Sequence, residues 1–115
     1  MNYKVHIILT GLETKPKLSQ LQVLVKPHVA SRWEEVGTAL GVADDDDGEQ
    51  LDRIHENRNG DCGMCFNDTM KLWLRSGSPS FPVTWATLIK AIKSVGGLEA
   101  VGAQIEAQLL TTSKL

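Results

Sequence analysis

Short runs of apolar residues recur along this chain at spacings of three and four positions, and nearly every run ends at a glycine or a proline. Such spacing places apolar side chains on one face of an α-helix, whereas a half-buried strand requires strict alternation. Glycine and proline commonly end helices, so the runs correspond to separate helices joined by short links. Short links favour antiparallel neighbours, and the pattern therefore predicts an all-α fold in which six helices form an antiparallel bundle.

The first predicted helix begins near Pro16 and is divided by a second proline. Its apolar positions are Leu18, Leu21 and Val25 before that proline and Val29, Trp33, Val36 and Leu40 after it. Pro27 lacks a backbone N–H and restricts Lys26 before it, so we expect helix 1 to be kinked at Pro27. Gly41 is placed to end the second piece.

The remaining helices follow the same spacing. Helix 2 is centred on Leu51 and Ile54, and Asn59-Gly60 indicates a turn after it. Residues Cys62 to Cys65 fit either a short third helix or a loop. Helix 4 carries Phe66, Met70, Trp73 and Leu74 and stops at Gly77. Helix 5 has Thr84 as its N-cap, carries Trp85, Leu88, Ile89 and Ile92, and ends at Gly96-Gly97. Helix 6 carries Leu98, Val101, Ile105 and Leu109.

Residues 1–14 differ from the rest of the chain. Tyr3, Val5, Ile7 and Leu9 lie at alternate positions, a weak period of two, and Gly11 ends the run. We expect an extended arm or the tail of a preceding segment over residues 1–14, and one domain over residues 15–115. A chain of 115 residues fits one domain of this kind and is long enough to bury a core without disulfides or metals.

The apolar landmarks, taken in order, resemble those of death domains. Trp33 followed by Val36, Leu40 and Gly41 resembles the first helix of that family, and Leu51-Asp52-Arg53-Ile54 resembles the second. Met70, Trp73 and Leu74 resemble the fourth helix, Thr84-Trp85 with Leu88 and Ile92 the fifth, and Val101 with Ile105 the sixth. The resemblance extends over residues 18–110 and is closest to death domains of invertebrate multidomain signalling receptors and adaptors. Caspase-recruitment and death-effector domains share the fold, but the three placed tryptophans favour the death-domain branch.

The resemblance implies the death fold, with Greek-key helical topology, and a function. Members of the family bind other death domains, through self-association or hetero-assembly, in intracellular apoptotic or innate-immune signalling complexes. We therefore expect a cytoplasmic interaction module that is not an enzyme and needs no cofactor. The residues expected in its core are Trp33, Val36, Leu40, Leu51, Ile54, Met70, Trp73, Leu74, Trp85, Leu88, Ile92, Val101 and Ile105.

Charged residues indicate where such a module would bind. The acidic side is the run Asp44, Asp45, Asp46 and Asp47 between helices 1 and 2, to which Glu34 and Glu35 add. The basic side is Arg53 and Arg58 near helices 2 and 3, with Lys71 and Arg75 on helix 4. In the family, the first inter-helix loop and the third-helix region of neighbouring domains can meet, which would pair opposite charges here. The alternative for the acidic run is a solvated loop without a partner.

The balance of charges argues against several classes of partner. The chain has 12 basic and 14 acidic residues and a formal net charge of -2, so we expect no binding to nucleic acid or to anionic membranes. No apolar run reaches the about 18 residues of a membrane-spanning helix. Two cysteines three positions apart cannot form a disulfide framework, which favours a reducing compartment.

The motif Cys62-Gly63-Met64-Cys65 is a C-x-x-C pair, which occurs in proteins of a different functional class. A C-x-x-C pair can exchange disulfides when a strand-to-helix context lowers the pKa of the first thiol, and no such context is visible. A structural zinc needs four ligands, and the chain contains no second C-x-x-C. We therefore expect no catalytic, cofactor-binding or metal-binding residues. A thiol-dependent redox enzyme or metal-binding protein built on Cys62 and Cys65 is the alternative.

Overall fold

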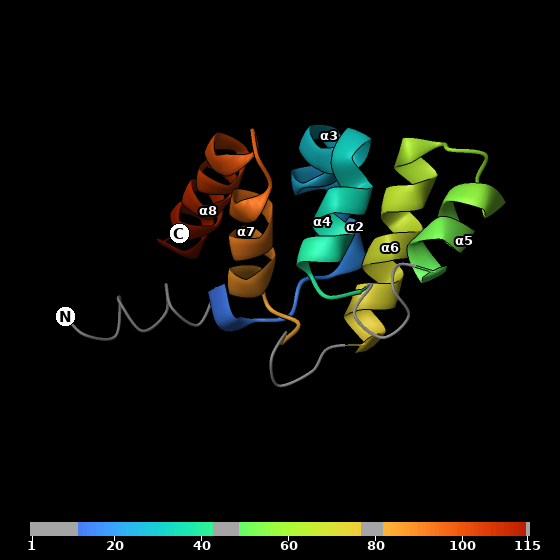
Figure 1. The fold of residues 1–115 in the computed structure, drawn as a ribbon. Helices are drawn as coiled ribbons and strands as arrows, with labels where there is room; N and C mark the ends of the chain where they lie inside the picture. The colour runs from blue at the N-terminus through green and yellow to red at the C-terminus, as the bar shows by residue number, and fades with distance from the viewer. Residues whose placement is uncertain (1–11, 43–48, 77–81, 115) are drawn as a thin grey trace.

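The computed structural model describes residues 12–42, 49–76 and 82–114, and every regular element in these ranges is a helix. In chain order they are α2 (Leu18–Leu24), α3 (Lys26–Val29), the 3₁₀ turn η1 (Ala30–Arg32), α4 (Trp33–Ala39), α5 (Glu49–Asn57), α6 (Cys62–Ser76), α7 (Trp85–Ser94) and α8 (Glu99–Lys114) (Figure 1). The prediction of an all-α helical bundle is confirmed at this level.

The helices pack as neighbouring pairs. Helices α7 and α8 form an antiparallel pair on one side of the bundle, and α5 lies on the opposite side against α6 (Figure 1). Between them, α4 packs on both α6 and α7. Helix α6 also contacts α2 and η1. Because several elements pack against α6, its position is fixed, and so are the positions from which its exposed side chains extend.

The first predicted helix differs from the expected two pieces. Val25 is the C-cap of α2 and the N-cap of α3, so the break lies at Val25 and not at Pro27. Pro27 instead lies in the first turn of α3, where a missing N–H leaves no helical hydrogen bond unmade. The 3₁₀ turn Ala30–Arg32 adds a second irregularity before α4. The predicted end is confirmed, because Gly41 has φ +82° and the N–H of Val42 reaches back to the carbonyl of Gly37 at 3.1 Å.

The connection between α5 and α6 is short, and each backbone N–H from Arg58 to Asp61 donates a hydrogen bond. Asn59 (φ +51°) and Gly60 (φ +74°) form the predicted turn, and the N–H of Gly60 donates to the carbonyl of His55 at 3.0 Å. The carboxylate of Asp61 then accepts the N–H of Met64 at 3.0 Å and caps α6. Residues Cys62 to Cys65 are therefore the first turn of α6, neither a separate third helix nor a loop. The sequence contained a signal for this helix start, because an aspartate, a common N-cap residue, follows Asn-Gly directly.

The core contains all three tryptophans. Trp33, Trp73 and Trp85 are 4%, 1% and 2% exposed. Most of the other residues expected in the core are also buried: Val36, Leu40, Leu51, Met70, Leu88, Ile92 and Ile105. The three remaining ones, Ile54, Leu74 and Val101, are half-buried and pack against the core. Phe66 and Leu98 are buried as well. The sequence placed both on helices but did not assign them to the core.

The expected extended arm falls mostly outside the described residues. Of its described part, Leu12 and Glu13 are helical, so the prediction of extended chain is wrong for these two residues. The carbonyl of Thr14 accepts the N–H of Trp85 at 3.1 Å. The chain just before α2 therefore lies against the start of α7.

Candidate interaction surface

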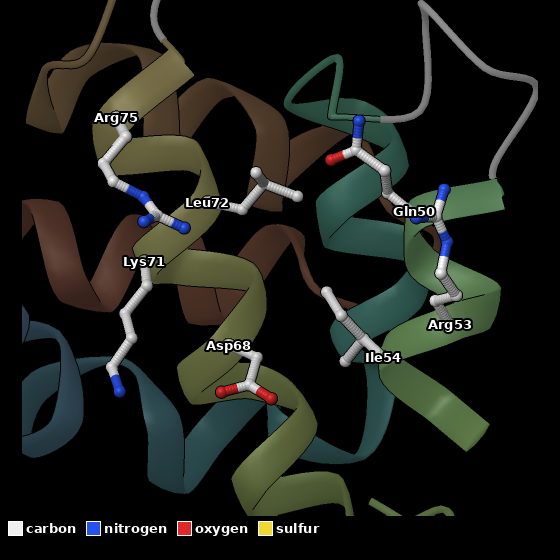
Figure 2. A pocket seen from close by; sticks show the side chains of 7 residues that line it. All are labelled: Gln50, Arg53, Ile54, Asp68, Lys71, Leu72 and Arg75. Atoms are coloured by element: carbon white, nitrogen blue, oxygen red, sulfur yellow. The ribbon is translucent and has the colours of Figure 1, made fainter. Parts of the chain in front are cut away.

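A groove lies between α5 and α6 and is lined by charged side chains over an apolar floor. We call it the basic groove, and it has a volume of about 260 Å³. Its walls are formed by Gln50, Arg53 and Ile54 of α5 and by Asp68, Lys71, Leu72 and Arg75 of α6. In Figure 2, Ile54 and Leu72 point toward each other from the two helices, and Lys71 extends along the other side of α6.

Helical spacing explains why these residues share one face. On α6, Asp68, Leu72 and Arg75 lie four and three positions apart, which places them along one stripe of the helix. The opposite stripe of α6 carries Met70 and Trp73, and both are buried. Since core packing fixes the rotation of α6, the charged stripe is turned toward solvent beside α5.

The groove is held in shape by an ion pair at one end. The guanidinium of Arg58 donates from Nε and Nη2 to the two carboxylate oxygens of Asp68 at 2.7 and 3.1 Å. This hydrogen bonding raises the pKa of Arg58 and lowers the pKa of Asp68. The carboxylate of Asp68 is therefore ionised and already engaged within the chain.

The remaining cations of the groove have weaker partners. Arg53 lies 3.5 Å from Glu49 of the preceding turn, and this side chain is 62% exposed. Within the described part of the chain, Lys71 and Arg75 form no salt bridge, and both residues are exposed. Asp68 is ion-paired with Arg58, and Glu49 is only loosely paired with Arg53. The three cations Arg53, Lys71 and Arg75 therefore leave an excess of positive charge at this surface, which attracts anionic groups.

Three of the four predicted basic residues therefore lie at one site. Arg53, Lys71 and Arg75 line the groove. Arg58 lies beside the groove, but it is ion-paired with Asp68 and therefore stabilises the packing of α6 against the end of α5. The predicted acidic run, Asp44 to Asp47, lies outside the described residues. The residues that sequence reasoning missed are Gln50, Asp68 and Leu72, although the spacing of Asp68, Leu72 and Arg75 could have indicated a shared face.

The two cysteines have unequal surroundings. Cys62 is exposed, whereas Cys65 is fully buried with its sulfur 3.8 Å from the carbonyl oxygen of Ile54. Burial raises the pKa of the Cys65 thiol, and the nearby Cys62 adds to the effect. A thiol with a raised pKa is a weaker nucleophile and a weaker metal ligand at neutral pH. Among the described residues, no group of three or more His, Cys, Asp or Glu side chains could hold a metal ion.

Two findings concern the chain as a whole. None of the helices in the described ranges is long and apolar enough to cross a lipid bilayer. Comparison with known proteins found no matching family model, no matching curated protein and no matching solved structure.

Proposed function

We propose that this chain is a non-catalytic protein–protein interaction module of the death-domain type. It has the Greek-key helical topology of the death fold and makes homotypic contacts with other death domains, including further copies of itself. It acts in the cytoplasm, in an apoptotic or innate-immune signalling assembly.

The observation that carries the proposal is the basic groove. Arg53, Lys71 and Arg75 are exposed around an apolar floor, and helices packed on the core hold them in place. A partner surface with carboxylates around one apolar side chain would complement it in both charge and polarity. The apolar floor excludes water from the centre of such a contact, and the cations at its rim supply specificity.

The residues behind the family resemblance lend further support. Trp33, Trp73 and Trp85 pack in one core, so the landmarks that suggested the family are the ones that hold these helices together. Charged residues between these landmarks are left at the surface, which suits a module whose surface charges select its partner.

The experiment that tests the proposal is sedimentation velocity of the purified chain over a range of concentrations. The wild-type chain should self-associate at low ionic strength and dissociate as salt is added, because exposed charge pairs are screened. The variant Arg53→Glu with Arg75→Glu should remain monomeric at concentrations where the wild type associates.

A matched control changes net charge by the same amount elsewhere. Lys15→Glu with Lys90→Glu reverses two exposed cations outside the basic groove and should associate like the wild type. Circular dichroism verifies that both variants remain folded. A wild-type chain that stays monomeric at every concentration and salt, or a control variant that loses association as fully as the groove variant, contradicts the proposal.

A further inference from the structure

The charged groups that line the basic groove and remain open to a ligand are hydrogen-bond donors. Lys71 and Arg75 carry donors only, and neither forms a salt bridge within the described ranges. Asp68 is the one carboxylate among the lining residues, and both of its oxygens accept hydrogen bonds from Arg58. A ligand that is complementary to this groove therefore supplies negatively charged acceptor atoms.

Two of the open cations stand one helical turn apart. Lys71 and Arg75 are four positions apart on α6, which makes them neighbours on the helix surface, with Cβ atoms about 5–6 Å apart. Figure 2 shows both on the side of Leu72 that faces away from Ile54, and both residues are exposed. A single carboxylate has one negative charge for these two cations. A phosphate monoester has about −1.5 to −2 charges at pH 7 and three acceptor oxygens, so it matches the pair better.

The third cation lies across the apolar floor of the groove. In Figure 2, Leu72 and Ile54 lie between Arg75 on α6 and Arg53 on α5. Arg53 is 3.5 Å from Glu49 on the exposed surface, and a contact of this kind contributes little, so a second carboxylate can replace it. Across its width, the groove thus presents a pair of cations, an apolar floor and a single cation.

We infer that the basic groove binds a phosphorylated, extended segment of a partner protein. A phosphoserine or phosphothreonine of the segment pairs with Lys71 and Arg75. Two positions along, an apolar side chain lies on Leu72 and Ile54, and two positions further an acidic side chain pairs with Arg53. Every second side chain of an extended segment points to the same side, and two residues span about 7 Å, which suits neighbouring helices about 8–10 Å apart. This ligand goes beyond the proposed function, because it is a linear segment that a kinase has modified.

Other carriers of phosphate match the surface less well. Binding to nucleic acid favours an excess of basic residues, whereas this chain has 12 basic and 14 acidic residues. Binding to a membrane surface favours exposed apolar side chains that enter the bilayer beside the cations. Among the described residues, the exposed large apolar side chains are Val23 and Met64, and neither lines the groove. A peptide supplies phosphate and apolar side chain together, as in other phosphorylated motifs that arginine clusters recognise.

Isothermal titration calorimetry with defined peptides tests the inference, at protein concentrations below any self-association. The probes are the capped peptide acetyl-Glu-Ala-Leu-Ala-phosphoserine-amide and its reversed sequence, because the groove does not fix the direction of the segment. At least one of the two should bind. Replacing its phosphoserine by glutamate should weaken binding about ten-fold or more, since the phosphate makes charge-assisted hydrogen bonds to two cations. Replacing its leucine by glycine should weaken binding as well.

Variants of the chain assign each part of the peptide to its contact. Lys71→Gln with Arg75→Gln should bind the phosphoserine and glutamate peptides equally weakly, because the groups that distinguish the phosphate are gone. Arg53→Gln should weaken both peptides and keep the preference for phosphate. The matched control, Lys15→Gln with Lys90→Gln, removes two exposed cations outside the groove and should bind like the wild type. Circular dichroism verifies that every variant is folded.

Several results would overturn the inference. The first is equal affinity of the wild-type chain for the phosphoserine and glutamate peptides, or no binding of either. The second is loss of binding in the control variant as full as in the groove variant. The third is binding of inorganic phosphate as tight as that of the peptide, and the fourth is binding to vesicles of phosphatidylcholine with phosphatidylinositol bisphosphate but not to the peptide. A chain that self-associates without binding the phosphopeptide keeps the proposed function and loses this inference, whereas a monomeric chain that binds it does the reverse.

Discussion

The guanidinium of Arg58, which follows the last residue of α5, holds both carboxylate oxygens of Asp68 on α6, at 2.7 and 3.1 Å. This forked contact closes one end of the basic groove and ties together two helices that are otherwise joined by a short turn. Because the hydrogen bonds lower the pKa of Asp68, the pair links the geometry of the groove to pH.

The first prediction concerns the pH dependence of this ion pair. A carboxylate with a lowered pKa in the folded state contributes stability above its unfolded pKa of about 4, and that contribution is lost as pH falls through the lower, folded pKa. Asp68→Asn should therefore lower the melting temperature at pH 7, and its difference from wild type should shrink as the pH falls below about 4. Thermal unfolding followed by circular dichroism at several pH values measures both effects. A difference that stays constant down to acid pH would show that Asp68 acts by packing and not by its charge.

The second prediction concerns the close approach of α4 and α6. A Cβ atom at Gly37 would lie 2.9 Å from Cγ2 of Thr69 and 3.2 Å from Cδ2 of Leu51. Overpacking a core of this kind costs about 1–3 kcal/mol, more than the up to about 1 kcal/mol that alanine gains over glycine in a helix. Gly37→Ala should therefore destabilise the fold by about 1–2 kcal/mol in urea unfolding.

Two companion variants separate crowding from other effects of Gly37→Ala. Adding Thr69→Ser removes the crowded methyl group and should recover part of the lost stability. Gly96→Ala introduces a Cβ with nothing within 4 Å and should leave the free energy of unfolding nearly unchanged. If Gly37→Ala is as stable as wild type, the helices are not packed as closely as described.

How much the sequence predicts depends on whether a feature is local. Thr84 was predicted as an N-cap from its place before a clean amphipathic run, and its hydroxyl accepts the N–H of Thr87 at 3.2 Å. The helix ends at Gly41 and at Asn59-Gly60 were likewise predicted from the local sequence. Glycine and asparagine adopt positive φ more readily than other residues, and all three positions have positive φ. The division of helix 1 was less accurate, because the rule that proline breaks a helix interior does not say that it can also start one.

The basic groove could not be predicted from the sequence, for a different reason. Arg53 and Arg75 were both predicted to belong to the basic side, but their position at one groove depends on how α5 packs on α6, which no spacing within one helix determines. Arg58 was assigned to the same surface, and only its distance to Asp68 shows that it is engaged within the chain. The partnership of Arg32 with Gly96 joins positions 64 residues apart, and no local pattern marks it.

The third prediction concerns the tryptophan at the start of α7. Trp85 is 2% exposed and packs in the core, so Trp85→Ala should cost about 3–5 kcal/mol of unfolding free energy. That is a large part of the stability of a small domain. Val23 of α2 is 72% exposed, and Val23→Ala should change stability by no more than about 0.5 kcal/mol. Urea unfolding of both variants provides the comparison, and equal midpoints for them would refute the assignment of Trp85 to the core.

The last prediction concerns the cysteines and tests the thiol alternative. Cys62 is exposed and should react quickly with a thiol reagent in the folded protein, whereas buried Cys65, with its raised pKa, should react only as the chain unfolds. Cys62→Ser should leave both stability and self-association unchanged. Cys65→Ala removes a buried sulfur and should lower stability by about 1 kcal/mol through lost packing, yet self-association of the folded variant should persist. On the proposed function neither sulfur takes part in assembly, so the double variant should assemble equally well with reductant or with a metal chelator present. Assembly that requires oxidation of this pair, or that is abolished by chelation, would make the thiols functional and the basic groove secondary.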